Sequence, residues 1–353
     1  MFWCTEALVT PKLQQPIRVL IVDDSATNRK ALSKVLETAP GIEVVGRAAD
    51  GEEGLKLAIQ LSPDVITLDL EMPKMDGYSF LRLLMARKPT PVIVVSSYAH
   101  HSDVFKALQL GAFDFVARPR VAGEAGFSAM RSELIEKLRA APFMRREDPR
   151  PVPKARQTTV KKLPELTRLV LIGASTGGPP AVQKVLESLA GLPVCVVIAQ
   201  HMPARFTQAF AERLDQALPF RVVEATHGDA IVAGRVYVAP GGEQVELEER
   251  AGKLMLSVKM TTAADQHAPS VDRLFLSAAN VAPPGARAVV LTGMGDDGAK
   301  GVRALDKAGV EVWAEAESTA VVFGMPGAAI KTGAVKKVLP LDELGPALAR
   351  SLG

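Results

Sequence analysis

Five short apolar segments of this chain each run directly into a reactive side chain or a tight turn that carries one. Two of them, 19–22 and 65–68, lie in the first third, and three, 169–172, 194–199 and 288–291, lie further along. The reactive groups that follow are Asp23 with Asp24, Asp69, Ser175, His201, and Asp296 with Asp297. In an open α/β sheet, groups just past the carboxyl ends of parallel strands converge on one crevice. The sequence therefore predicts two crevices, one with carboxylates and one with a serine, a histidine and an aspartate.

The length of the chain and one proline-rich stretch predict two domains. A chain of 353 residues exceeds the usual size of a single domain. Residues 141–165 contain five prolines and seven basic residues, which favours a semi-extended linker, with docking as the alternative role. We expect an N-terminal extension at 1–16, a first domain at 17–140 and a second domain at 166–353.

The alternation of strand and helix patterns predicts an α/β class in both domains. Each should hold a mostly parallel sheet with helices on both faces, the first flavodoxin-like and the second a Rossmann-like three-layer domain. Strands are predicted at 18–22, 43–48, 65–69, 91–96, 113–117, 169–173, 194–199, 221–224, 235–239, 288–292 and 310–314. Helices are predicted at 25–39, 52–61, 77–87, 101–110, 127–140 and 180–189. We also expect a hairpin over about 235–259, with Pro240-Gly241-Gly242 as its turn.

Composition excludes several classes of protein. The net charge of +3 is too small to indicate nucleic-acid binding. Two cysteines do not form a disulfide framework. No apolar run reaches the length of about 18 residues that a membrane helix needs, and residues 1–16 lack the pattern of a signal peptide. We expect a cytoplasmic protein without membrane insertion, with a monomer as the default.

The first crevice has the chemistry of a magnesium-dependent phosphorylation site. Three carboxylates at one switch point repel each other unless a cation joins them, and oxygen-only ligands suit Mg²⁺. Asp69 is then the group best placed to attack a phosphoryl donor. Ser96 can donate a hydrogen bond to an added phosphoryl oxygen, and Arg118 can supply a second cation. The alternative is that these aspartates only cap helix N-termini.

The second crevice begins with a glycine-rich turn, Gly173-Ala174-Ser175-Thr176-Gly177-Gly178. Such a turn at a helix N-terminus can cradle a phosphate, although the dinucleotide fingerprint is absent because Ser175 replaces its second glycine. It can also present Ser175 as a nucleophile, or it can be a purely structural turn. The sequence around the serine does not decide between these three roles.

The other two strand ends favour the nucleophile. His201 can take the proton of Ser175, and an aspartate can fix the tautomer of His201. Chemistry alone does not choose between Asp296 and Asp297. The other histidines are taken as structural or surface residues, although His267 can line the cleft. The chain order Ser, His, Asp differs from that of the α/β-hydrolases, which excludes that fold.

The first third resembles the receiver domain of two-component response regulators. The motifs that carry the resemblance are Val22-Asp23-Asp24-Ser25, the stretch 68–77 (LDLEMPKMDG) and the stretch 111–115 (GAFDF). It implies that Asp69 accepts the phosphoryl group and that Asp24, Asp69 and the backbone carbonyl of Glu71 hold Mg²⁺, with Asp23 in the outer shell. It also implies switch roles for Ser96, Phe115 and Arg118. Receivers usually have lysine where this chain has Arg118, a planar fork rather than a point charge.

The second half resembles the catalytic domain of the chemotaxis protein-glutamate methylesterases, the CheB family. The matching stretches are 172–178 (IGASTGG), 200–203 (QHMP), 206–207, 210–214 (FAERL), 237–242 (YVAPGG), 269–272 (PSVD), 291–298 (LTGMGDDG) and 323–326 (FGMP). The resemblance implies Ser175 as nucleophile, His201 as base, Asp297 as the orienting carboxylate, and Thr176 and Met294 at the oxyanion. Gln244 replaces a histidine found in many relatives, which should affect substrate fit more than chemistry.

Together the two resemblances imply a phosphorylation-regulated serine hydrolase. It would demethylate glutamate methyl esters on chemoreceptors, deamidate receptor glutamines, and need no cofactor for the esterase reaction. A chemotaxis histidine kinase would be the phosphodonor, and the unphosphorylated receiver would block the catalytic cleft. Two alternatives stay open: a receiver joined to a non-catalytic receptor-binding adaptor, and a serine esterase acting on another ester of a sensory pathway.

Overall fold

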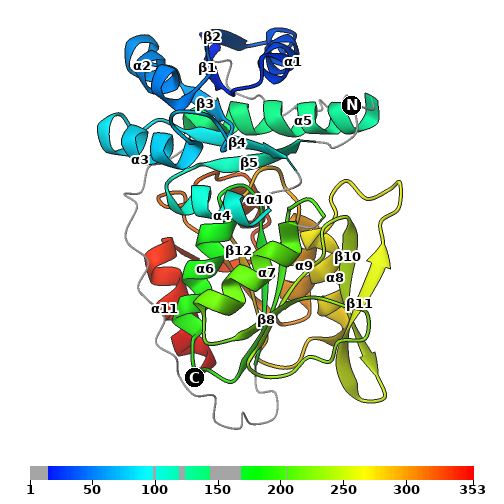
Figure 1. Ribbon diagram of the computed structural model, residues 1–353. Coiled ribbons are helices and arrows are strands. Elements are labelled where there is room, and N and C mark those ends of the chain that lie inside the picture. The colour runs from blue at the N-terminus through cyan, green and yellow to red at the C-terminus, as the bar shows by residue number, and fades with distance from the viewer. Residues whose placement is uncertain (1–14, 98–100, 119–123, 144–167, 205) are drawn as a thin grey trace, which may run out of the picture. The chain divides into compact units, whose positions relative to one another are not determined.

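The chain folds into two compact units, each built on its own parallel sheet. The computed structural model (Figure 1) describes residues 15–97, 101–118, 124–143, 168–204 and 206–353. The predicted extension 1–16 and linker 141–165 lie almost entirely outside these residues. The α/β class expected from the sequence is confirmed in both units.

The first unit has a five-stranded sheet with the order β2-β1-β3-β4-β5, and every neighbouring pair is parallel. Its strands are β1 (Ile17–Val22), β2 (Ile42–Ala48), β3 (Val65–Leu68), β4 (Val92–Ser97) and β5 (Asp114–Arg118). The helices in this part of the chain are α1 (Ala26–Glu37), α2 (Gly51–Leu61), α3 (Gly77–Arg87), α4 (His101–Gln109) and α5 (Glu124–Ala140), followed by the 3₁₀ turn η1 (Ala141–Phe143). Each predicted strand lies within one residue of the observed one.

The helices begin where short polar side chains follow a strand. Ser25, Asp50 and Asp76 each accept a hydrogen bond from a backbone N–H in the first turn of α1, α2 and α3. These caps satisfy donors that the helix itself leaves unpaired. They therefore end the loops at fixed points beside the carboxyl edge of the sheet.

The second unit has a seven-stranded parallel sheet with the order β14-β13-β12-β6-β7-β9-β8. Its strands are β6 (Arg168–Ala174), β7 (Val194–Gln200), β8 (Arg221–Glu224), β9 (Arg235–Val238), β12 (Arg287–Val290), β13 (Glu311–Glu315) and β14 (Val335–Leu339). Its helices are α6 (Gly178–Leu189), α7 (Phe206–Ala217), α8 (Val271–Val281), α9 (Ala299–Lys307), α10 (Met325–Lys331) and α11 (Leu341–Leu352). The first strand of this unit, β6, has β7 on one side and β12 on the other, so the strand order reverses there.

The predicted hairpin over 235–259 is wrong in its placement. β9 joins the main sheet in parallel, and the antiparallel pair is β10 (Glu243–Arg250) with β11 (Lys253–Met260). Its turn is Ala251-Gly252, where both residues have positive φ angles, +50° and +74°. Pro240-Gly241-Gly242 instead brings the chain against the segment after β7: a Cβ at Gly241 would lie 2.5 Å from the backbone nitrogen of Ala204. The glycine signal there marks a close backbone approach rather than a hairpin.

The edge strand β14 was not predicted from the sequence. Its residues are half-buried or exposed, and two of them, Lys336 and Lys337, are charged. Charged side chains are common on sheet edges because they discourage pairing with another chain. An edge strand of this kind lacks the continuous apolar run by which the central strands were found.

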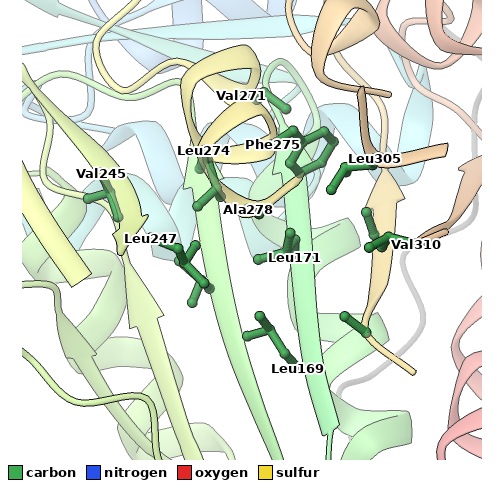
Figure 2. Close-up of a cluster of buried hydrophobic side chains, with 14 of the residues drawn as sticks. Leu169, Leu171, Val245, Leu247, Val271, Leu274, Phe275, Ala278, Leu305 and Val310 are labelled. Carbon is green, nitrogen blue, oxygen red and sulfur yellow. The ribbon is translucent and has the colours of Figure 1, made fainter. Parts of the chain in front are cut away.

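A buried cluster packs one face of the second sheet against α8, α9 and the β10–β11 hairpin. Figure 2 shows Leu169 and Leu171 of β6 beside Leu274, Phe275 and Ala278 of α8, with Val245 and Leu247 of β10 on one side. Leu171, Leu274 and Phe275 are fully buried. Burial of such side chains contributes about 1.5–3 kcal/mol each, so α8 is firmly fixed over β6. Its N-terminus therefore has a defined position beside the carboxyl end of that strand.

No helix in the described part of the chain is long and apolar enough to cross a membrane.

Candidate active site and phosphorylation site

The end of β6 presents Ser175 on a tight turn. Gly177 has a φ of +75°, and Gly178 begins α6 by donating its backbone N–H to the Ser175 carbonyl at 2.8 Å. A Cβ at Gly177 would lie 2.7 Å from Val321, so the close packing there also requires glycine. Pro179 and Pro180 follow in the first helical turn, where proline is favoured. The turn leaves the Ser175 side chain partly exposed.

The ends of β7 and β12 lie on either side of this turn. The backbone N–H of His201 donates to the carbonyl of Ala174 at 2.9 Å, and that of Ser175 donates to the carbonyl of Thr292 at 3.0 Å. A Cβ at Gly293 would lie 2.8 Å from the Cβ of Ser175. The expectation that the ends of three neighbouring strands converge is therefore met by direct contacts.

His201 and Asp297 form a hydrogen-bonded pair. Nε2 of the imidazole lies 2.8 Å from Oδ2 of the carboxylate, and the side chains are 14% and 5% exposed. Asp296 is exposed, so the structure brings Asp297 to the histidine and thereby makes the choice that chemistry left open. Among the described residues no hydrogen bond joins Ser175 Oγ to His201. With Nε2 on the carboxylate, Nδ1 is the imidazole nitrogen left to accept a proton.

Asp297 accepts three further hydrogen bonds. Ser270 Oγ donates to Oδ1 at 3.0 Å, and the backbone N–H groups of Asp272 and Val271 donate to Oδ1 at 2.9 Å and Oδ2 at 2.7 Å. Burial raises the pKa of Asp297, but the bond and charge of His201 and these backbone donors outweigh it and lower the pKa to about 2. The carboxylate is therefore ionised and fixed in orientation at neutral pH.

Two residues of this site, Ser270 and Gln200, were not assigned a role from the sequence, and a third, His267, was expected only to line the cleft. Ser270, the N-cap of α8, braces Asp297. Gln200 is 1% exposed, and its Nε2 donates to the carbonyls of Ser175 and His201 at 2.8 and 3.1 Å. His267 stacks on the His201 ring. Gln200 and Ser270 lie within the matching stretches 200–203 and 269–272, but residue type alone did not signal the contacts that they make.

The predicted oxyanion residues lie beside the serine. Thr176 is 4% exposed, and its carbonyl accepts a hydrogen bond from Thr292 Oγ1 at 2.9 Å. Met294 is half-buried and follows Gly293, the residue packed against Ser175. Their part in oxyanion binding stays a prediction.

In the first unit, Asp23, Asp24 and Asp69 meet at the carboxyl ends of β1 and β3. Each offers a carboxylate oxygen, and the three oxygens lie within 4.8 Å of one another. Asp23 is buried at 1% exposure and Asp24 is exposed. An oxygen-only set with one solvent-facing member fits Mg²⁺, which keeps several of its waters when bound.

Arg118, at the end of β5, forms ion pairs with two of these carboxylates. Its Nη2 lies 2.7 Å from Asp23 Oδ2 and 3.6 Å from Asp69 Oδ2, and it donates to the Val95 carbonyl at 3.2 Å. Burial raises the pKa of Asp69, with Arg118 opposing that effect and Asp23 adding to it. Arg118 is shared between Asp23 and Asp69, and a second guanidinium, that of Arg29, donates to the Asp23 carbonyl at 2.6 Å.

The remaining receiver residues occupy the expected elements. Ser96 lies in β4 with its backbone opposite Ala117, and its side chain lies outside the described part of the chain. Phe115 is buried in β5, with Lys137 Nζ 5.2 Å from its ring centre. The backbone N–H of Glu71 donates to Asp69 Oδ1 at 3.3 Å, so the Glu71 main chain borders the acceptor. The metal and switch roles of these residues stay predictions.

Known families match both units. Residues 170–348 match the CheB methylesterase family, and residues 19–124 match the response regulator receiver domain. A Myxococcus xanthus protein named protein-glutamate methylesterase/protein-glutamine glutaminase 1 is 58% identical over 334 residues, which cover 94% of this chain and 96% of that protein. An Anaeromyxobacter dehalogenans protein of the same name, numbered 6, is 50% identical over 94% of each chain. The crystal structure of the Thermotoga maritima CheB methylesterase catalytic domain covers 52% of this chain and 97% of its own, with 37% identity and a TM-score of 0.50.

Proposed function

The chain belongs to the CheB methylesterases that carry a response regulator receiver domain, and we propose that it hydrolyses glutamate methyl esters and deamidates glutamines on chemoreceptors. The observation that carries the proposal is the His201–Asp297 pair at 2.8 Å beside the Ser175 turn. These groups stand at the ends of three neighbouring strands, where ligands bind in open α/β sheets.

Ser175 is the nucleophile in the proposed reaction. Its Oγ attacks the carbonyl carbon of the methyl ester while His201 takes the hydroxyl proton through Nδ1. Asp297 holds Nε2–H and stabilises the imidazolium, a role supported by its low pKa of about 2 and its four hydrogen bonds. As the tetrahedral intermediate collapses and the ester C–O bond breaks, His201 donates its proton to the methoxide oxygen, which leaves as methanol. Water then attacks the acyl-enzyme with His201 as base, and the Ser175 oxygen leaves with the proton returned to it.

Thr176 and Met294 stabilise the oxyanion in this scheme. They are the residues that follow Ser175 and Gly293, which pack so closely that a Cβ at Gly293 would lie 2.8 Å from the Ser175 Cβ. Preorganised donors of this kind are typically worth about 3 kcal/mol each in the transition state. A glutamine amide presents the same carbonyl geometry with ammonia as leaving group, so the same residues serve deamidation without a cofactor.

Asp69 is the proposed phosphoryl acceptor of the receiver. Asp24, Asp69 and the Glu71 carbonyl would hold Mg²⁺ directly and Asp23 would hold it through water, as the 4.8 Å carboxylate cluster supports. The ion would offset the charge that gathers on the transferred phosphoryl group. Ser96 and Arg118 then contact the added phosphoryl oxygens, and Phe115 responds to the change. A chemotaxis histidine kinase is the proposed donor.

Phosphorylation is proposed to relieve inhibition by the receiver. In this scheme an extension at 1–16 precedes the receiver domain at 17–140. The linker 141–165 joins the receiver to the catalytic domain at 166–353. The unphosphorylated receiver covers the catalytic cleft, and phosphorylation shifts the population toward a state that releases it. We place the enzyme in the cytoplasm, because the proposed substrate helices of chemoreceptors lie there. A monomer is the default for its oligomeric state.

The test is methanol release from a methylated receptor fragment. Wild type and Ser175→Ala are compared with and without a small phosphodonor and Mg²⁺. Release that needs Ser175 and rises with the phosphodonor supports both sites. Release that needs Ser175 but ignores the donor removes the regulatory part. Absence of release from a folded wild type contradicts the esterase and favours a receptor-binding adaptor or an esterase for another ester.

A further inference from the structure

We propose that His267 is a positioning residue that holds the His201 imidazole in the plane needed to take a proton from Ser175. The inference rests on the function proposed above and adds a residue to its machinery. The two rings are stacked, with centroids 4.4 Å apart and an angle of 9° between their planes. This is the face-to-face contact of an offset stacked pair.

A second restraint on His201 is needed because the Asp297 bond fixes only one edge of the ring. The hydrogen bond described for the His201 side chain joins its Nε2 to Asp297 Oδ2. The last torsion of a histidine is broad, so a single hydrogen bond leaves the ring free to turn about the Nε2–Oδ2 line. Such a turn would swing Nδ1 away from a fixed partner. A flat neighbour on one face opposes that motion.

His267 is itself held by buried hydrogen bonds. Gln244 is fully buried, and its Nε2 donates to the His267 carbonyl at 2.6 Å. Its Oε1 accepts from the backbone N–H of Ser270 at 2.8 Å, and the Gly242 N–H donates to the Ala268 carbonyl at 3.0 Å. The donor and the acceptor of one amide group thus lock the segment 267–270. This gives Gln244, where a histidine was expected, a structural part in aligning the base.

The same segment also carries the groups that orient Asp297. Ser270 Oγ and the Val271 N–H both donate to the carboxylate. One stretch of chain, 267–271, therefore sets the carboxylate that binds the His201 edge and the ring that covers its face. The Asp297 carboxylate and the His267 ring are therefore held by the same segment, so the His201 imidazole stays aligned with both of them.

The electrostatics favour a neutral His267 during the reaction. Burial lowers the pKa of His267 from its ordinary value of 6.5, and the charge of His201 lowers it further, while Asp297 and Asp296 oppose the shift. At neutral pH the ring is therefore uncharged and does not repel the imidazolium that forms on His201. In acid, a protonated His267 would repel the imidazolium that forms on His201, so the stacked ring would then slow the reaction of Ser175.

The experiment measures the reactivity of Ser175 towards a fluorophosphonate probe in the full-length chain. The variants are His267→Ala, which removes the ring, and His267→Phe, which keeps a flat face without charge, with Ser175→Ala as the blank. We expect His267→Ala to slow labelling by about tenfold or more, since misplacement of a catalytic group by about 1 Å can cost that much. His267→Phe should stay within about threefold of wild type, and neither should change the melting temperature of the second unit.

The pH profile separates this role from simple packing. Below pH 6.5 the wild type should lose labelling rate relative to His267→Phe, because only the wild type can place a second positive charge beside His201. A parallel profile for the two proteins would overturn the electrostatic part. Labelling of His267→Ala at the wild-type rate, or of a folded His267→Phe as slowly as His267→Ala, would overturn the positioning role. If His267→Ala fails to fold, His267→Leu, which fills the site without a flat ring, takes its place in the same comparison.

The probe keeps this inference separate from the substrate assignment. Fluorophosphonates react with any activated serine and need no receptor. Labelling that depends on His201 and His267 together with no methanol release would leave the positioning role standing and remove the proposed substrate. Methanol release that is unchanged in His267→Ala would leave the proposed substrate standing and remove the positioning role.

Discussion

At the scale of single residues, the orientation of His201 depends on Asp297. We expect Asp297→Asn to lower kcat for methanol release by about 10³–10⁴-fold, because an amide favours the wrong histidine tautomer. Three other donors also point at this carboxylate, so an amide NH₂ group would face at least one of them. The measurement is steady-state methanol release with the melting temperature as a check on folding.

Asp296→Asn is the matched control for this variant. Asp296 is the neighbour in the chain but is exposed, so the change removes the same charge without touching the hydrogen bond to His201. Its kcat should stay within about twofold of wild type, as for most surface substitutions. Equal losses in the two variants would contradict the assignment of Asp297.

Arg118 sets the charge of the phosphorylation site. Arg118→Ala removes a cation that lies 2.7 Å from Asp23 and 3.6 Å from Asp69. The apparent affinity for Mg²⁺ should therefore rise several-fold, since less positive charge opposes the ion, while phosphorylation slows. Arg131→Ala, which removes an α5 guanidinium bonded to Thr38, is the control. Titration with Mg²⁺ checks the result, and weaker binding in Arg118→Ala would contradict it.

The reactive groups of the two sites were predicted from their places at strand ends, whereas the side chains that support them were not. Ser175, His201 and Asp297 follow apolar runs, so their convergence could be inferred from the parallel sheet. Gln200, the last residue of β7, and His267, in the segment before α8, act through side-chain contacts, and no periodicity signals which partner such a side chain meets. Chemistry alone did not separate Asp296 from Asp297, because both follow the same strand, whereas the family resemblance implied Asp297 and the structure brings that residue to His201.

At the scale of elements, the glycines show how one sequence signal has several meanings. Pro240-Gly241-Gly242 and Ala251-Gly252 both favour a turn, yet only the second joins hairpin strands. Position 241 requires glycine because the chain after β7 passes within 2.5 Å of where a Cβ would be. Only the tertiary structure separates a turn glycine from one required by close packing.

The central strands were predicted well because their burial on both faces leaves a continuous apolar run.

The loop after β12 gives a prediction at this scale. Gly293→Ala would place a Cβ 2.8 Å from the Ser175 Cβ and 3.1 Å from its backbone nitrogen, and against the Met325 sulfur. We expect a stability loss of about 1–3 kcal/mol from overpacking and a larger proportional loss of kcat, because the serine turn must shift. Thermal melts and methanol release on the same samples check both quantities.

Gly309→Ala separates the two effects. Gly309 has a φ of +80°, and among the described residues no atom beyond its two chain neighbours lies within 4 Å of the place that a Cβ would take. Alanine there therefore costs about 1–2 kcal/mol of backbone strain without touching the site. It should lower the melting temperature and leave kcat unchanged. A matching loss of kcat in Gly309→Ala would mean that stability alone explains the result for Gly293→Ala.

At the scale of the whole molecule, each unit has its own sheet and its own reactive site, so the two chemistries should be separable. Asp69→Asn removes the proposed phosphoryl acceptor and should abolish stimulation by a phosphodonor, while basal methanol release stays within about twofold, because the Asp69 carboxylate takes no part in the ester chemistry. Ser175→Ala should abolish release yet still incorporate phosphate to the wild-type level. Phosphate incorporation and methanol release are measured on both variants. Loss of phosphate uptake in Ser175→Ala, or of basal release in Asp69→Asn, would show that the sites are not independent, and the receiver would then be part of the catalytic machinery rather than its regulator.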